Sequence, residues 1–290
     1  MRYVKERDLK LKILVTGGSG YLGTHVRRFF GADDFSRRSH LDILNPHDLA
    51  RVGDYDAVIH LAAHLDKNPQ AAETCFRTNA EGTANVLRNM QPNACFVYAS
   101  TKDVYGAHAD NYSEVPETCS TDYINQSALE WSKLMGERYV DYYARERSVR
   151  ACILRLSNVY APSSDNNEPG FVGNYVEAIK HGEALRLPLH GSPVRDILHV
   201  EDLARACQCF IDSSVAYGLY NLGGGRFGAT TLRELVETIG RLAARTPVID
   251  EAAGLPVPSP VNYISDTSRA MSELDWRPTI SIEEGIKTLL

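Results

Sequence analysis

Three glycines, Gly17, Gly20 and Gly23, form the pattern whose residue type and spacing point most directly to chemistry. They follow an apolar run typical of a strand and open a run typical of a helix, a context that distinguishes them from an ordinary glycine-rich turn. The first glycine allows a tight turn, the second lets the backbone approach a pyrophosphate at the helix N-terminus, and the third lets the helix pack on the strand. The sequence therefore predicts a nicotinamide dinucleotide here, contacted also by Tyr21 and Leu22.

The segment after this helix bears on which dinucleotide is bound. An acidic residue often ends the second strand of such a fold and accepts from the ribose 2′-hydroxyl, but here Arg37 and Arg38 stand in that region. Arginine donates bidentate hydrogen bonds to a 2′-phosphate, so the sequence slightly favours NADP over NAD. The alternative is that both arginines are solvated loop charges. Asp42 and Ile43 are placed to meet the edge and the face of the adenine.

Further motifs follow in order along nearly the whole chain. They are 58–63 (VIHLAA), 78–83 (TNAEGT), 98–106 (YASTKDVYG), 154–160 (LRLSNVY), 195–202 (RDILHVED) and 274–278 (LDWRP). With the glycine turn, they resemble the extended, or atypical, short-chain dehydrogenases/reductases of the NAD-dependent epimerase/dehydratase family, which modify nucleotide sugars. The resemblance implies that Leu61, Ala62, Ala63 and Ser157 border the cofactor.

The resemblance also implies a catalytic set: a hydroxyl that holds the sugar oxygen, a tyrosine that passes its proton, and a lysine one helical turn later. Thr101 falls at the hydroxyl position, and Lys133 at the position that binds the nicotinamide ribose and lowers the tyrosine pKa. Four residues before Lys133, on the same helix face, stands Leu129. Leucine carries no proton to transfer. Two other tyrosines could replace the missing one. Tyr105 is better explained as a packing aromatic, and Tyr123 lies too far along the chain from Lys133 to share its helical turn.

Three interpretations follow from this loss. In the first, the chain remains an enzyme with Lys102 as acid and Asp103 as base, because dehydratases of the family carry a paired acid and base there; exposed loop charges are an equal alternative. In the second, a regulatory or binding protein keeps the cofactor site without catalysis. In the third, a reductase or epimerase takes its proton from water or substrate. We predict an NAD(P)-dependent nucleotide-sugar epimerase, dehydratase or 4-ketoreductase with an atypical active site, and keep the catalytically silent protein as the alternative.

Two residues are expected to contact the substrate. By resemblance, Arg195 grips a diphosphate, a bidentate role that lysine fills less well. Asn158 would meet the sugar nucleotide, although a buried amide that satisfies local backbone groups is the alternative. The arginine that usually joins Arg195 is replaced in the uncharged, proline-rich run 255–259, which puts diphosphate binding in question.

The elements that must position these residues alternate between short apolar runs and helical periodicity, as in parallel strands joined by crossover helices. We expect strands at 12–16, 57–62, 95–99, 150–156 and 217–222, and helices at 21–30, 71–90, 127–145, 172–181 and 232–243. The predicted fold is α/β: a Rossmann-type doubly wound parallel sheet with a smaller C-terminal substrate lobe. The dinucleotide domain would span 1–158 with returns near 195–222, and the substrate lobe mainly 159–194 and 223–290.

Composition narrows the partners. Lys and Arg number 31 against 37 Asp and Glu, a net charge of -6 without a basic stripe, so nucleic acid is not an expected partner. The charged first residues and the short apolar runs predict a cytoplasmic chain without a membrane partner. The 6 cysteines lack metal-ligand spacing, so no metal is expected, although Cys119 is a candidate reactive thiol. By resemblance, helices 71–90 and 127–145 would pair across a two-fold axis as a homodimer.

Overall fold

A parallel sheet forms the centre of the computed structural model, which describes residues 11–164, 167–250 and 255–290. Its strands lie in the order β2, β1, β3, β4, β5, β9, and every neighbouring pair runs parallel. They are β1 (Ile13–Thr16), β2 (Asp33–Phe35), β3 (Ala57–His60), β4 (Cys95–Thr101), β5 (Arg150–Leu156) and β9 (Tyr217–Leu222). The strand order reverses between β1 and β3, and such a switch point is where open parallel sheets bind ligands.

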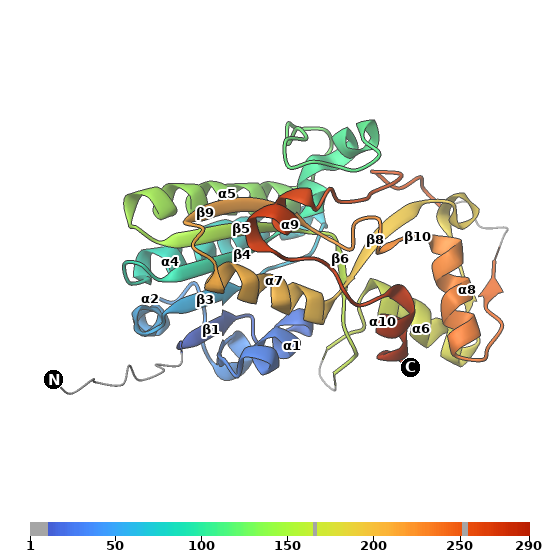
Figure 1. Cartoon of the computed structure of the whole chain (residues 1–290), viewed down its shortest axis with the longest axis horizontal. Helices are drawn as coiled ribbons and strands as arrows, with labels where there is room; N and C mark the ends of the chain where they lie inside the picture. The colour runs from blue at the N-terminus through green and yellow to red at the C-terminus, as the bar shows by residue number, and fades with distance from the viewer. Residues whose placement is uncertain (1–10, 165–166, 251–254) are drawn as a thin grey trace.

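Helices cover both faces of this sheet (Figure 1). On one face lie α1 (Tyr21–Phe30) and α7 (Val200–Asp212); on the other lie α4 (Gly82–Asn89) and α5 (Ala128–Glu146). Because alternate strand residues point to opposite faces, Val15 packs into the core that contains α7 residues, and Leu14 into the core with α4 and α5 residues. All four residues of β1 are buried, which explains its continuous apolar run.

A smaller lobe lies beyond one end of this sheet (Figure 1). Its three-stranded sheet has the order β10, β8, β6, with β10 antiparallel and β6 parallel to β8. The lobe contains β6 (Asn158–Tyr160), β7 (Ala184–Leu185), β8 (Val194–His199), β10 (Ala229–Thr231), β11 (Val248–Ile249), α6 (Phe171–His181), α8 (Leu232–Leu242) and α10 (Ile282–Lys287). The predicted doubly wound sheet with a smaller C-terminal lobe is confirmed, while the exact residue limits of the two domains stay a prediction.

Several predicted elements differ from the structure in their bounds, the helix over 71–90 most of all. The helix expected over 71–90 comprises a 3₁₀ turn, α3 (Ala72–Cys75), a π-helical turn at Phe76–Glu81, and α4. Within the π turn, the Asn79 side chain accepts from the His64 amide and donates to the Ser132 hydroxyl, contacts to distant segments that a local periodicity does not encode. The strand expected over 57–62 ends at His60, and Leu61 turns toward the cavity described below.

Among the described residues, no helix is both long and apolar enough to cross a membrane. Those residues also contain no group of three or more His, Cys, Asp and Glu side chains arranged to hold a metal ion. Cys119 is buried, and burial raises the pKa of its thiol, although Arg155 partly opposes the shift. This environment disfavours the reactive thiolate.

Candidate functional site

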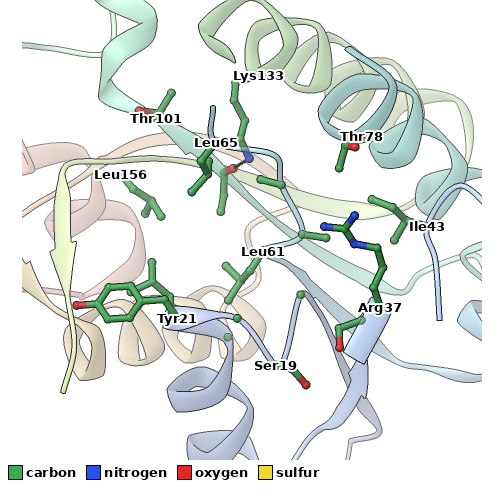
Figure 2. A pocket seen from close by; sticks show the side chains of 18 of the residues that line it. Ser19, Tyr21, Arg37, Ile43, Leu61, Leu65, Thr78, Thr101, Lys133 and Leu156 are labelled. Atoms are coloured by element: carbon green, nitrogen blue, oxygen red, sulfur yellow. Dashed lines mark hydrogen bonds between the residues drawn. The ribbon is translucent and has the colours of Figure 1, made fainter. Parts of the chain in front are cut away.

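A cavity of about 710 Å³ opens at the carboxyl ends of β1, β3, β4 and β5 (Figure 2). All of the predicted cofactor residues line it, together with Thr101, Asp103 and Leu129: Gly17, Gly20, Tyr21, Leu22, Gly23, Arg37, Arg38, Asp42, Ile43, Leu61, Ala62, Ala63, Lys133 and Ser157. Figure 2 shows its two ends, with Arg37, Ile43 and Thr78 at one and Thr101, Lys133 and Leu156 at the other. We refer to them as the adenosine end and the catalytic end.

The glycine turn brings backbone, not side chains, to the cavity wall. Gly17 has φ +70°, and a Cβ there would lie 2.8 Å from the amide nitrogen of Ala62, so only glycine fits without a shift. Gly20 precedes the first residue of α1, and neither a side-chain cap nor an acidic residue occupies that helix start. The first amides of α1 are therefore left for an anion, and the turn fits a dinucleotide pyrophosphate.

The structure separates the two arginines of the adenosine end. Arg38 donates from Nη1 to the Ser19 carbonyl (2.7 Å) and to Asn167 Oδ1 (3.0 Å), so it ties the glycine turn to the segment after β6. Arg37 extends into the cavity beside Ile43 (Figure 2). Asp42 accepts from the Leu44 amide and shapes its own turn. Arg37 is thus the better placed of the two to meet a 2′-phosphate.

Asp34 and Asn167 were not predicted. Asp34, in β2, accepts hydrogen bonds from the Ser19 and Ser36 hydroxyls and does not line the cavity. Two consecutive aspartates, Asp33 and Asp34, stand in β2, and this local pattern could have identified Asp34 from the sequence. Asn167 donates to the Ser19 carbonyl at 3.3 Å from 148 positions away, and no motif marks it.

At the catalytic end, Lys133 lies on α5 and Thr101 closes β4. The Lys133 ammonium is buried and donates to the Ala99 carbonyl at 2.7 Å. Burial lowers the pKa of Lys133 to about 8, against the opposing effect of Glu137 one turn later. Thr101 Oγ1 accepts from the Asp103 amide at 3.1 Å, which leaves its proton available to a ligand.

Leu129 lines the same cavity one turn before Lys133. This turn of α5 is held firmly: Ser127 and Glu130 form a capping box, and the Ser132 hydroxyl donates to the Leu129 carbonyl at 2.8 Å. Asn79 in turn donates to the Ser132 hydroxyl at 2.9 Å. The backbone at this position is therefore ordered for a side chain directed at the cavity, and that side chain is apolar.

Among the described lining residues, every tyrosine hydroxyl is already hydrogen-bonded to the protein. Tyr21 lines the cavity, but its hydroxyl accepts from the Ala161 amide and donates to the Ala161 carbonyl. Tyr105 is buried away from the cavity and donates to Asn221 Oδ1 at 2.6 Å. Tyr123 is 66% exposed and stacks on Trp131. The structure therefore brings neither Tyr105 nor Tyr123 to Lys133.

Lys102 and Asp103 do come together, but as an ion pair. Asp103 lies 2.5 Å from the Lys102 ammonium and 2.9 Å from that of Lys67, which also contacts Glu130. Burial alone would raise the pKa of Asp103, but the two ammonium groups hold it well below its usual range. Asp103 is thus a carboxylate of low basicity on the cavity wall, and Lys102 does not line the cavity.

The predicted substrate residues lie outside the lining of this cavity. Arg195 Nη1 donates to the carbonyls of Val194 (2.8 Å) and Val261 (2.7 Å). Asn158 donates to the Asp196 carbonyl at 3.1 Å. Its amide thus satisfies a backbone group, which is the alternative that the sequence left open. Asp196, missed from the sequence, is buried and accepts from the hydroxyl of Ser157 and from the backbone amide of Gly224, so it joins the two lobes beside the cavity.

Comparison with known proteins agrees with this architecture. Residues 13–223 match the model of the NAD dependent epimerase/dehydratase family. The chain is 24% identical to dTDP-4-dehydro-6-deoxyglucose reductase of Escherichia coli over 96% of each chain. It is 28% identical to dTDP-glucose 4,6-dehydratase of Mycobacterium tuberculosis, covering 97% of this chain and 92% of that one. The structure of UDP-glucose 4-epimerase with UDP-glucose from Thermotoga maritima is similar with a TM-score of 0.79 and 26% identity, covering 96% and 97% of the two chains.

Proposed function

Because the chain belongs to the NAD dependent epimerase/dehydratase family, we propose that it is an NAD(P)-dependent nucleotide-sugar epimerase, dehydratase or 4-ketoreductase with an atypical catalytic end. One observation carries this proposal: the glycine turn, Thr101 and Lys133 line a single cavity at the switch point of the sheet. The atypical feature is Leu129, which we assign to the place of the family's proton-carrying tyrosine.

In this proposal, the backbone at Gly17 and Gly20 and the start of α1 hold the pyrophosphate. Arg37 meets the adenosine end and gives NADP a slight advantage over NAD. Lys133 reaches the nicotinamide ribose from α5. The bound dinucleotide supplies or accepts a hydride at the substrate carbon. Thr101 holds the oxygen on that carbon, and the apolar side chains of Leu129 and Leu156 exclude water from it.

For the substrate, we propose that Arg195 binds the diphosphate with the donors that Val194 and Val261 leave unused. Its guanidinium is half-buried and already oriented by two carbonyls, which reduces the entropy lost on binding. Asn158 would contact the sugar only if its amide released the Asp196 carbonyl.

Leu129 favours a second candidate, a catalytically silent NAD(P)-binding regulatory or binding protein. The two functions separate in one experiment. The purified protein is examined for bound dinucleotide by its near-ultraviolet absorption and then incubated with a panel of UDP-, dTDP-, GDP- and CDP-sugars. Conversion of any of these sugars supports the enzyme; tight dinucleotide binding without conversion of any sugar establishes the silent protein.

We further propose a homodimer formed through α5 and the helical segment 71–90. The outer face of α5 exposes Trp131, Met135 and Tyr142, an apolar stripe at helical spacing. Light scattering is expected to give a dimer mass, and Met135→Glu to give a monomer. Met271, equally exposed at 43% but on α9 (Ser268–Leu274), provides the control Met271→Glu, which should stay dimeric. A monomeric wild type contradicts the proposal.

A further inference from the structure

The catalytic end of the cavity is poor in groups that carry a transferable proton. Among the described lining residues, the titratable side chains are Tyr21, Arg37, Arg38, Asp42, Asp103 and Lys133. The two arginines and Asp42 belong to the adenosine end, and arginine does not release a proton in proteins. Tyr21 uses its hydroxyl on both backbone groups of Ala161. Lys133 and Asp103 remain.

Asp103 is a poor proton carrier, since two ammonium groups hold it ionised at neutral pH. It has no proton to donate and little tendency to accept one. Lys133 differs in both respects. Its ammonium carries three N–H groups and donates one of them to the Ala99 carbonyl. Lys133 lines the cavity, so its other two N–H groups lie beside the space that a substrate would fill.

The charged and titratable groups around Lys133 leave it able to release and regain a proton. Glu137, one turn further along α5, accepts from Ser100 on β4 and forms a buried ion pair with Arg155 on β5, so its charge is already compensated. On β3, His60 is uncharged, because burial and, secondarily, Lys133 lower its pKa to about 3. The Tyr98 ring on β4 lies 5.1 Å from the ammonium nitrogen. Burial lowers the pKa of Lys133 to about 8, so ammonium and amine are both accessible near neutrality.

We infer that Lys133 itself transfers the proton at the substrate oxygen, in the role that a tyrosine would have at position 129. The inference rests on the proposed function, a hydride transfer at a sugar carbon. When a carbonyl is reduced, an N–H bond of Lys133 breaks and an O–H bond forms on the former carbonyl oxygen as the hydride adds to carbon. The neutral amine then regains a proton from water. In the oxidative direction the amine takes the hydroxyl proton.

The first test needs no turnover. Lysine ε-carbons are labelled with ¹³C, and their NMR signals are titrated from pH 6 to 11 in wild type, Lys133→Arg and Lys180→Arg. We expect one signal with a midpoint near 8, lost in Lys133→Arg and kept in Lys180→Arg, a partly exposed control on α6. Titration of every lysine near its ordinary value of about 10.4 overturns the inference.

The second test uses turnover. Wild type should reduce a keto-sugar nucleotide at a rate that falls above about pH 8, whereas a rate independent of pH contradicts the role of Lys133. Lys133→Arg keeps the charge but should lose at least about 100-fold in rate at saturating dinucleotide. Adding Leu129→Tyr to Lys133→Arg should restore part of that loss. A Lys133→Arg rate within tenfold of wild type overturns the inference.

The two proposals fail in distinguishable ways. A lysine signal near pH 8 without conversion of any sugar by wild type or Leu129→Tyr overturns the proposed function, and with it the reaction that Lys133 would serve. Conversion without such a signal overturns the role of Lys133 alone. If Lys133→Arg does not fold, the wild-type rate profile and the NMR titration still decide.

Discussion

The glycine turn and the catalytic end of the cavity are built differently. At the glycine turn, the wall is largely backbone: a glycine at positive φ, the uncapped start of α1, and the Ser19 carbonyl held by two side chains. At the catalytic end, the wall is made of individual side chains from β4, β5 and α5. Backbone contacts tolerate most substitutions nearby, whereas proton transfer depends on one functional group. Such a cavity can therefore retain its dinucleotide while its chemistry changes.

The largest effect is expected at the glycine turn. Gly17→Ala should weaken dinucleotide affinity about 100-fold, or about 3 kcal/mol, because its Cβ would press on Ala62 at a positive φ. Gly182→Ala is the matched control, since Gly182 has φ +69° but open space around a Cβ. Calorimetric titration with NADP and NAD measures both. Equal losses in the two variants would show that backbone strain, and not the cavity wall, is responsible.

A smaller effect is expected where the substrate lobe meets the cavity. Arg195→Met should raise the KM for a nucleotide sugar about 30-fold, in line with about 2 kcal/mol for charge-assisted hydrogen bonds to a diphosphate. Dinucleotide affinity should not change, so the two ends would respond independently. Steady-state kinetics with calorimetry tests this, and an unchanged KM would remove Arg195 from the substrate site.

At the catalytic end, Leu129→Tyr should raise kcat about tenfold, because a phenol one turn before Lys133 adds a second proton carrier. The side chain enters an ordered turn that Ser132 and Asn79 hold in place. Single-turnover rates of hydride transfer are the measurement. An inert variant that still binds dinucleotide would mean that the substrate lobe has also diverged.

The smallest effect concerns cofactor choice. Arg37→Ser should lower the preference for NADP over NAD about 5-fold, which corresponds to one charge-assisted contact at an exposed site. Arg38→Ser should affect both dinucleotides alike, because Arg38 binds Ser19 and Asn167. Dissociation constants for the two dinucleotides give the ratio. A ratio that changes only in the Arg38 variant would reverse this assignment.

The sequence predicts the local geometry of the cavity better than its tertiary contacts, for a physical reason. The turn at Gly17 is local: strand, glycines and helix lie within a dozen residues, so their spacing alone dictates the geometry. The same holds for Lys133 and Leu129 on one helix face. By contrast, Arg38 and Asn167 meet at Ser19 through tertiary contacts, and nothing local shows that Arg38 is engaged there.

The ion pair of Lys102 with Asp103 illustrates the same limit. Its two residues are adjacent, so the sequence could suggest an acid and a base. Lys67, however, comes from a loop after β3, and its charge adds to that of Lys102 in holding the pKa of Asp103 low. Similarly, the Tyr21 hydroxyl is occupied by Ala161, 140 positions away. A pKa depends on every nearby charge, and those charges are placed by the complete fold.

The link at the Ser19 carbonyl also bears on kinetics. Arg38 and Asn167 hold one oxygen of the glycine turn from two sides, so the turn and the segment after β6 must separate before either can move far. A dinucleotide seated on this turn would then leave slowly, since the hydrogen bonds of Arg38 and Asn167 to the Ser19 carbonyl would have to break first. It would behave as a resident redox group that keeps its oxidation state between encounters.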